Sequence, residues 1–460
     1  MKIWLHGEPW ARAYSCRETQ RDGSAVEAMT RAPLIAMAVA TGNGSQNASA
    51  GARASTIPTP LVPGAGRVIL LLALVAFGSA MSMRVMDAAI PQLAIDFGIG
   101  IRHAASVVTV FAIAYGCLQI VFGPAGDRFG KLRVILFACV CAALASAACA
   151  LAQSFTMLLV ARVAAGASMA SMIPLAMAWI GDNVDYEHRQ PVLARFLVGQ
   201  IAGLAMGQAV GGIATDLVSW RLPFWFLVLW FVVMAVLLTR LVRTPAQRAA
   251  ADSADTQPRI GLAAQIRSVL AQPWARCVLV TVFLEGAALY GPFAFFATHL
   301  HVKHGLSLSF AGSMLVAFAV GGVSYAFGAG RLLRRLGESG LARGGAILLA
   351  IGIAIVALAP TGMPPALFAL PGLFAAGLGF YMLHNTLQIN ATQMAPNARG
   401  TAVAIFASCF FLGQSVGVAI GGYVVERVQT TPVMIAGALA LLAIGLSFSA
   451  MRATRDRIAA

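Results

Sequence analysis

The chain has 460 residues, of which 59% are hydrophobic and 11% charged, and its formal net charge at pH 7 is +15. Soluble domains carry charge on about a quarter of their residues, so this composition excludes a protein whose main solvent is water. The basic residues lie in thin clusters between apolar runs, not on one domain with interleaved aromatic residues, which argues against a nucleic-acid partner.

Residues 1–65 differ in composition from the rest of the chain. They are rich in Gly, Ala, Ser and Thr, and prolines gather near their end. Such a segment buries too little apolar surface to fold, so we expect a disordered cytoplasmic leader. Its only apolar run, Leu34–Ala40, is too short for a signal-peptide core, so no cleavage is expected. One alternative stays open, namely that translation begins at Met29 or later.

Twelve apolar segments follow the leader, and each is long enough for a spanning helix, which needs about 20 mostly apolar residues. Their approximate limits are 66–95, 104–126, 131–152, 155–180, 192–215, 221–241, 274–300, 308–330, 341–360, 365–393, 401–424 and 431–452. We therefore expect an all-α integral membrane protein with twelve transmembrane helices in two six-helix, pseudo-symmetric halves. The expected divisions are an N-terminal six-helix half at 66–242, a cytoplasmic central loop at 243–273, a C-terminal six-helix half at 274–452 and a cytoplasmic tail at 453–460.

The positions of Lys and Arg set the expected orientation, because loops on the cytoplasmic side carry the excess of both. With the N-terminus inside, the outer connections hold only Arg102, Arg221, Lys303 and Arg427, and the inner connections hold many more basic residues. Both termini and the central loop are therefore expected in the cytoplasm, and the chain as a multi-pass protein of the bacterial inner membrane. The basic, Gly-rich loops at 123–133 and 328–337 occupy equivalent places in the two halves, as expected of a duplicated transporter.

Cysteine and histidine show no ligand-type spacing. Most of the seven cysteines lie inside apolar spans, where Cys acts as a small hydrophobic residue. His299, His301 and His304 lie at the outer end of the seventh span, where we expect an interfacial loop and not a metal site. We expect no metal and no cofactor.

The loop after the second span carries the clearest motif. Its motif residues are Gly123, Asp127, Arg128, Gly130, Lys131 and Arg133. The loop resembles the signature G-x-x-x-D-R-x-G-[RK]-[RK] of the major facilitator superfamily, with the second basic residue displaced by one position. This resemblance covers about residues 66–452 and implies a twelve-helix transporter that works by alternating access. Asp127 ends a span on a basic surface, so we expect a gating contact with a neighbouring helix N-terminus or an Arg. For the three basic residues, the topological role is sufficient.

Other stretches resemble patterns of the same superfamily. Arg162–Gly166 in the fourth span resembles its R-x-x-x-G pattern, and His384–Gly400 resembles bacterial sugar or arabinose efflux permeases. Glycines four residues apart in the fifth span resemble the ladder of drug antiporters, but Gln208 stands where those members have proline. For this ladder and a similar one in the eleventh span, static packing and a surface on which the halves rock both stay open.

Seven polar residues inside the spans are candidates for a substrate and proton pathway. A charge at the bilayer centre costs about 2.5–3.5 kcal/mol on insertion scales, so each one needs a reason. They fall in spans 1, 4, 7 and 10, which line the central cavity in the superfamily that the loop resembles. The candidates are Arg84, Asp87, Arg162, Glu285, His384, Asn385 and Gln388.

Glu285 is our first candidate for a proton carrier, because no basic residue lies within a turn of it on its own span. Arg84 stands three residues before Asp87, so we expect both on one helix face, where Arg84 favours the ionised form of Asp87. A purely structural role stays open as the alternative for each of these residues. Arg84 and Asp87 would form a structural ion pair, Glu285 a permanent link between helices, and His384 a hydrogen-bonding wall residue.

The sequence therefore predicts a secondary active transporter, not an enzyme, that exports a small molecule such as a sugar, drug or metabolite by proton-coupled alternating access. The expected partners are this substrate, H⁺ as coupling ion and the lipid bilayer, with no nucleic acid, and the protein is expected to be a monomer. The sequence contains no G-x-x-x-x-G-K-[ST] loop, so ATP-driven pumping by this chain is unsupported. An intramembrane enzyme, a non-transporting sensor or channel, and an uptake symporter stay open as alternatives.

Overall fold

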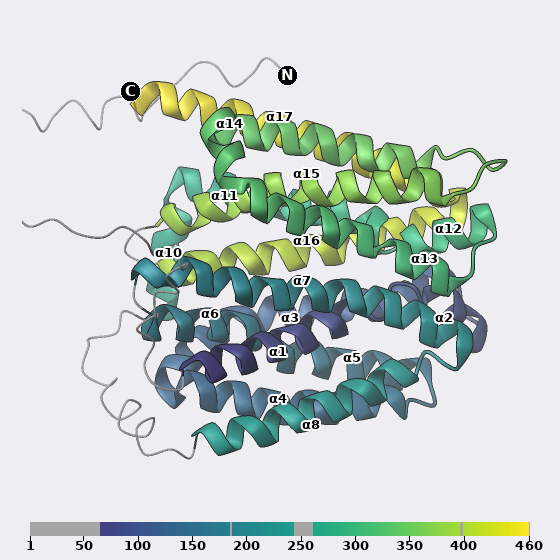
Figure 1. The fold of residues 1–460 in the computed structure, drawn as a ribbon, viewed down its shortest axis with the longest axis horizontal. Helices are drawn as coiled ribbons and strands as arrows, with labels where there is room; N and C mark the ends of the chain where they lie inside the picture. Colours follow the sequence, from purple (N-terminus) through teal and green to yellow (C-terminus); the bar gives the residue numbers. More distant parts are fainter. Residues whose placement is uncertain (1–64, 185, 243–260, 396–398, 460) are drawn as a thin grey trace, which may run out of the picture. The chain divides into compact units, whose positions relative to one another are not determined.

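A computed structural model of the chain describes residues 65–184, 186–242, 261–395 and 399–459, and in these residues all regular secondary structure is helical (Figure 1). The first helix group is α1 (Ala65–Arg84), α2 (Ile90–Asp96), α3 (Ile101–Phe129), α4 (Lys131–Ala150), α5 (Phe155–Met169), α6 (Met172–Asn183), α7 (Tyr186–Leu217) and α8 (Leu222–Val242). The second helix group is α10 (Leu262–Ala271), α11 (Pro273–Phe293), α12 (Phe296–His304), α13 (Leu308–Met314), α14 (Val316–Ala357), α15 (Ala366–Gln393), α16 (Arg399–Val428) and α17 (Thr430–Ala459). The predicted leader lies almost wholly outside the described residues, as does most of the predicted central loop.

Eleven segments of the described chain are long and apolar enough to span a membrane. A chain with this many such segments is a multi-pass membrane protein. The number of segments differs from the twelve expected from the sequence because of one place in the chain. The expected spans 308–330 and 341–360 fall in one candidate, Leu308–Ala357, because α14 runs through both. Its backbone is non-helical at Gly337, where φ is 65° and ψ is 177°.

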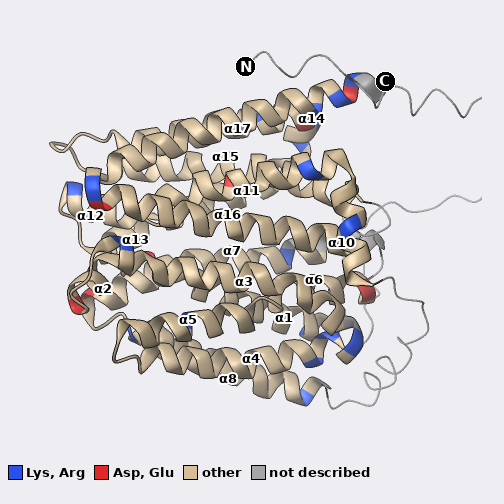
Figure 2. Ribbon diagram, turned by 180° about the vertical axis from the view of Figure 1, so that it is seen from behind, with Lys and Arg blue, Asp and Glu red and all other residues tan. Residues whose placement is uncertain are grey.

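Charged residues gather at the two ends of the helix bundle, and few lie in the helix bodies between them (Figure 2). One end carries α10, and we call it the α10 end. The opposite end carries α2, α12 and α13, and we call it the α12 end (Figure 1). More of the Lys and Arg residues lie at the α10 end (Figure 2).

The first expected span is broken into two helices. Helix α1 ends at Arg84, residues 85–89 form a turn, and α2 begins at Ile90 with Pro91 in its first turn. Their spacing predicted that Arg84 and Asp87 share a helix face. They do not, because Asp87 lies in the turn, although their side chains still meet. Every residue of the turn is at most 1% exposed. Non-helical backbone at membrane depth is tolerated where protein covers it, and the burial of this turn meets that condition.

Glycines fix the distance between α7 and α1 in the first group. A side chain at Gly199, Gly203 or Gly207 would overlap a backbone carbonyl of α1, and one at Gly211 would overlap the Val85 carbonyl in the turn after α1. These carbonyls also recur every four residues. Small residues at such positions let two backbones approach closely. The second group repeats the arrangement, because Gly413, Gly417 and Gly421 of α16 lie against carbonyls of α11. The ladders are therefore packing surfaces within each helix group.

The last glycine of each ladder faces the other helix group. A side chain at Gly212 of α7 would overlap the carbonyl of Leu308 at the start of α13, and one at Gly422 of α16 would meet the backbone of Arg102 in α3. Beside Gly212, the Asp216 carboxylate accepts a hydrogen bond from the backbone N–H of Ser309. These contacts join the two helix groups at the α12 end.

Candidate functional site

Arg84 makes three contacts, two of which join it to the second helix group. Its Nη1 lies 3.4 Å from Asp87 Oδ2, and its Nη2 donates a hydrogen bond of 3.1 Å to Gln414 Oε1 in α16. The guanidinium carbon also lies 4.0 Å from the centre of the Tyr290 ring in α11, a cation–π distance. Arg84 is 2% exposed, so its charge is stabilised by these groups instead of water.

Sequence reasoning missed Gln414 and Tyr290. Gln414 is fully buried, and its Nε2 has no hydrogen-bond partner among the described residues. A buried N–H group without a partner costs about 1–3 kcal/mol, so such a group marks a place where a ligand or a conformational change supplies an acceptor. The signal was present in the sequence, since Gln414 is an amide inside the apolar eleventh span.

Arg162 occupies a different environment. Its Nε donates to the carbonyl of Val107 and its Nη1 to the carbonyl of Ser82, at 3.2 and 3.1 Å. Its guanidinium carbon lies 4.2 Å from the centre of the Phe111 ring. These bonds tie α5 to α3 and to the end of α1. Within the described chain Arg162 forms no ion pair, so its contacts favour a structural role over a substrate contact.

Glu285 and His384 form the second candidate centre. His384 Nδ1 in α15 lies 2.8 Å from Glu285 Oε2 in α11, a hydrogen-bond distance. The Glu285 side chain is fully buried, whereas that of His384 is 17% exposed. Glu285 Oε1 has no hydrogen-bond partner among the described residues. The His384 ring therefore lies between the buried Glu285 carboxyl group and the space that solvent can reach.

Aromatic rings surround His384 and separate the two centres. The His384 ring centre lies 5.0 Å from that of Phe380 and 4.6 Å from that of Phe410. Phe410 in turn packs 5.6 Å from Tyr290, the ring that covers Arg84. Bulk water is thus excluded between the Arg84 centre and the Glu285 centre, which strengthens electrostatic interactions in both.

A small cavity lies against the Arg84 centre. It has a volume of about 30 Å³ and is lined by Arg84, Gln208 and several aromatic residues, among them Tyr290, Phe318 and Phe380. These residues come from both helix groups. The cavity is mostly apolar and has room for about one water molecule beside Arg84 and Gln208, but a larger ligand requires the two groups to move apart.

The remaining pathway candidates lie along α15. Asn385 Nδ2 donates a hydrogen bond of 3.0 Å to the Tyr325 hydroxyl in α14. Gln388 is partly buried one turn beyond His384. The seven predicted residues thus fall into the Arg84 centre, the Glu285 centre, the α15 pair and the separate Arg162. The histidines of α12 have partners outside this pathway: His299 Nδ1 lies 2.7 Å from Thr430 Oγ1, and His301 Nδ1 lies 2.6 Å from the Leu306 carbonyl oxygen.

Most of the predicted gating loop is helical. Gly123, Asp127 and Arg128 lie in the last turns of α3, and Lys131 begins α4. Only Gly130 breaks the helix, with φ 87°, a backbone region that favours glycine. Lys131 pairs with Asp182 at the end of α6. The Asp127 side chain lies outside the described part of the structure, so its gating contact stays a prediction.

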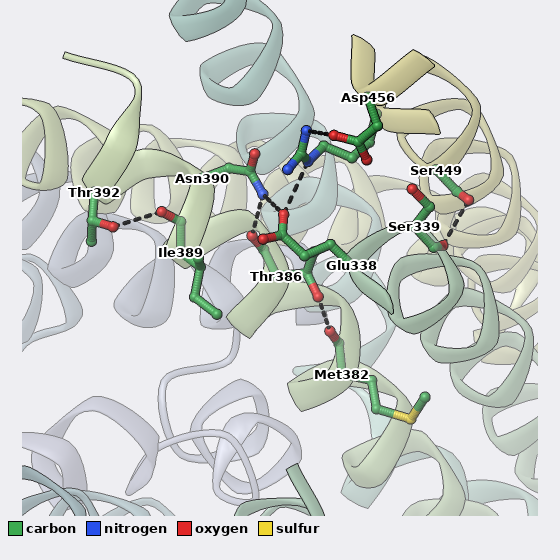
Figure 3. Close-up of polar contacts among 10 residues, drawn as sticks. Glu338, Ser339, Met382, Thr386, Ile389, Asn390, Thr392, Ser449 and Asp456 are labelled. Atoms are coloured by element: carbon green, nitrogen blue, oxygen red, sulfur yellow. Dashed lines mark hydrogen bonds and ion pairs between the residues drawn. The ribbon is translucent and has the colours of Figure 1, made fainter. Parts of the chain in front are cut away.

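The equivalent place in the second helix group holds a charge network that sequence reasoning missed (Figure 3). Glu338 Oε2 accepts hydrogen bonds from Asn390 Nδ2 at 3.1 Å and from Arg452 Nε at 3.0 Å, while Arg452 also pairs with Asp456. The network joins α14, α15 and α17 directly after the break at Gly337. Glu338 is an acid in a basic loop, which is the same signal that selected Asp127.

Glu338→Gln is expected to lower the stability of the folded protein by about 1–2 kcal/mol, because two hydrogen bonds to a charged acceptor are weakened at a partly buried site. A matched control is Asp456→Asn, which also removes a partner of Arg452 but at a side chain that is 51% exposed. Thermal unfolding of the purified variants in detergent measures both. An equal loss for the two variants would contradict a special role for Glu338.

Comparison with known families decides the assignment of the chain. The sequence model of the Major Facilitator Superfamily matches residues 72–418. The chain belongs to the Major Facilitator Superfamily. Members of this superfamily are transporters, so the protein is a transporter of small molecules and not an enzyme, which confirms that part of the prediction.

Individual relatives agree with this family. The MFS-type transporter YceJ of Bacillus subtilis is 24% identical over 352 residues, which are 74% of this chain and 84% of YceJ. The multidrug export protein EmrB of Haemophilus influenzae is 28% identical over 163 residues, 35% of this chain and 32% of EmrB. A crystal structure of the nucleoside transporter NupG superposes with a TM-score of 0.70 at 13% identity, over 84% of this chain and 99% of NupG. The superposition shows a shared superfamily fold.

Proposed function

We propose that this chain is a proton-coupled exporter of a small organic molecule that works by alternating access. The observation that carries the proposal is the buried Glu285 bonded to the partly exposed His384. A carboxyl group removed from water changes its charge only when its surroundings change. A conformational change that moves His384 away from Glu285, or opens the space beside it, alters the proton affinity of the pair and couples protons to transport.

The architecture that we propose is twelve spanning helices in two halves. As one straight helix, the 42 residues of α14 would be about 63 Å long at about 1.5 Å per residue, twice the roughly 30 Å core of a bilayer. Two spans that meet near the break at Gly337 would each have about half this length, which matches the bilayer core. The repeated ladders support the two halves, since α7 lies on α1 in the same way as α16 lies on α11.

The substrate would bind between the halves, at the Arg84 centre. Arg84 already contacts Gln414 and Tyr290 of the other helix group. A substrate that takes over these contacts binds both halves at once, and its binding energy then differs between access states, as a transporter requires. Asn385 and Gln388 lie near the Glu285 centre on α15 and complete the proposed pathway.

Export is the direction that the relatives favour. EmrB is named as a multidrug export protein, and the matched part covers 35% of this chain. The rival within the same class is an uptake symporter built on the same site. A sugar, a drug or a metabolite all fit a centre that offers both charge signs, amides and aromatic rings.

The function is tested by comparing a deletion strain with an overexpressing strain for drug susceptibility and for metabolite export. The substrate found in this screen is then followed in proteoliposomes with an imposed pH difference. Accumulation against the substrate gradient, driven by the pH difference, supports the proposal. Substrate movement that does not depend on the pH difference would overturn proton coupling. Inward accumulation of the substrate in whole cells would favour the symporter.

We place the protein in the bacterial inner membrane as a monomer with both termini in the cytoplasm, so that the α10 end faces the cytoplasm. The excess of Lys and Arg at the α10 end supports this orientation. Reporter fusions at Arg455 are expected to show cytoplasmic activity, and fusions at Lys303 periplasmic activity. The opposite pattern would reverse the topology.

A further inference from the structure

One face of α14 is exposed along its whole length toward the break at Gly337. Val320, Phe327 and Arg331 lie on this face at spacings of four and seven residues, which keep side chains on one side of a helix. Arg334 and Arg335 continue the same face by one turn. The face is therefore mostly apolar over the spanning part, where the Ser324 hydroxyl donates to the Val320 carbonyl, and strongly basic at the α10 end.

The three arginines form a cationic patch without partners. Arg331, Arg334 and Arg335 are all exposed, and none has an ion pair, hydrogen bond or cation–π contact with another residue of the described chain. The nearest acid along the helix, Glu338, is engaged by Asn390 and Arg452. Three positive charges on one helix turn repel each other unless an anion lies between them.

Phe327 lies one turn closer to the membrane centre than Arg331. Its side chain is 86% exposed, more than any other large hydrophobic residue in the described part of the chain. A ring so exposed at the end of a span contacts the lipid beside it, next to the headgroups that the arginines reach.

An apolar groove continues the same face. It has a volume of about 530 Å³ and is lined by Val320 and neighbouring residues of α13 and α14 on one side, and by Leu370 and Phe374 of α15 on the other. Along the helix, the eleven residues from Val320 to Arg331 correspond to about 16 Å, close to half of the roughly 30 Å bilayer core. The distance from the arginines to the groove is thus the depth of one lipid leaflet.

We propose that this face of α14 is a binding site for one anionic phospholipid. The phosphate of the headgroup lies between Arg331, Arg334 and Arg335, one acyl chain passes over Phe327, and the end of that chain fills the groove beside Val320. Zwitterionic lipids are bound more weakly, because their headgroups offer no net negative charge to the three guanidinium groups.

The test uses the full-length protein in detergent, incubated with equal amounts of phosphatidylglycerol and phosphatidylcholine, and native mass spectrometry to count the lipids retained. We expect retention of one phosphatidylglycerol over phosphatidylcholine. The variant R331Q/R334Q/R335Q is expected to weaken phosphatidylglycerol binding about 100-fold, since each charge near a membrane surface contributes about fivefold. The matched control R267Q/R276Q/R343Q removes the same number of exposed arginines from other places on the same helix group.

Three further outcomes decide the proposal. Glycerol phosphate, which carries the headgroup anion without chains, is expected not to displace phosphatidylglycerol, and Phe327→Ser is expected to weaken lipid retention. Displacement by glycerol phosphate would mean a soluble anion site and overturn the lipid assignment. Equal losses in the two triple variants would mean general charge attraction, and equal retention of both lipids would also overturn the proposal.

Discussion

Glu285→Gln is expected to abolish substrate accumulation driven by a pH difference, with a loss of about 100-fold, the scale on which a positioned proton-transfer group acts. The amide keeps the size of the side chain and can still accept a hydrogen bond from His384, so packing in α11 is preserved. The amide of Gln cannot take up or release a proton at the pH values of a transport assay. Exchange of substrate between preloaded vesicles needs no net proton movement and should therefore continue. Proteoliposomes with and without an imposed pH difference measure both activities.

Asp87→Asn is the informative comparison for this variant. It leaves Arg84 with an uncompensated charge in a buried site, which costs several kcal/mol when one partner of a buried pair is removed. Both accumulation and exchange should fall. If Glu285→Gln vesicles still concentrate substrate when the pH difference is applied, Glu285 is not the proton carrier.

Gly212→Val is expected to shift the protein toward the conformation that is open at the α12 end. The new side chain would overlap the Leu308 carbonyl across the contact between the helix groups. Overpacking of this kind costs about 1–3 kcal/mol, which changes the ratio of two conformations roughly 5- to 150-fold. The cost applies only while that contact is closed, so the variant favours separation. Spin labels at Val218 and Phe310, which are 70% and 51% exposed, report the distance across the contact.

Gly199→Val serves as the matched control. It introduces the same side chain on the same helix, but against the Ala73 carbonyl within the first helix group. We expect lower thermal stability and an unchanged distance between the spin labels. A label distance that stays the same in Gly212→Val, with stability lowered as in the control, would show that Gly212 has no special part in access.

The spans and their polar residues could be predicted because the membrane constrains both directly. A bilayer core sets the length of an apolar helix and makes each charge within it costly, so hydropathy alone identified nearly every span and also Arg84, Arg162 and Glu285. Long-range pairing leaves no such signal. Glu285 and His384 were both selected, yet nothing in the sequence says that α11 and α15 bring them within 2.8 Å.

Backbone breaks were harder still. The three-residue spacing of Arg84 and Asp87 suggested one continuous helix through both, but a turn follows Arg84. In α14 a basic loop was expected between two spans, and the break is confined to Gly337, with helical geometry on both sides. Hydropathy reports how deep a segment lies, whereas a local break depends on which neighbours can satisfy the freed backbone groups.

The glycine ladders also set an order in time. The carbonyls of α1 that lie under Gly199, Gly203 and Gly207 belong to the first helix of the described chain, but their partner α7 is more than a hundred residues further along the chain. At a synthesis rate of about 5–20 residues per second, α1 waits on the order of ten seconds for the surface that it fits. Helix α11 faces the same delay before α16 is made. During each interval the helix face shaped for close backbone contact lacks its partner helix, so each helix group completes its assembly late, when its ladder helix is made.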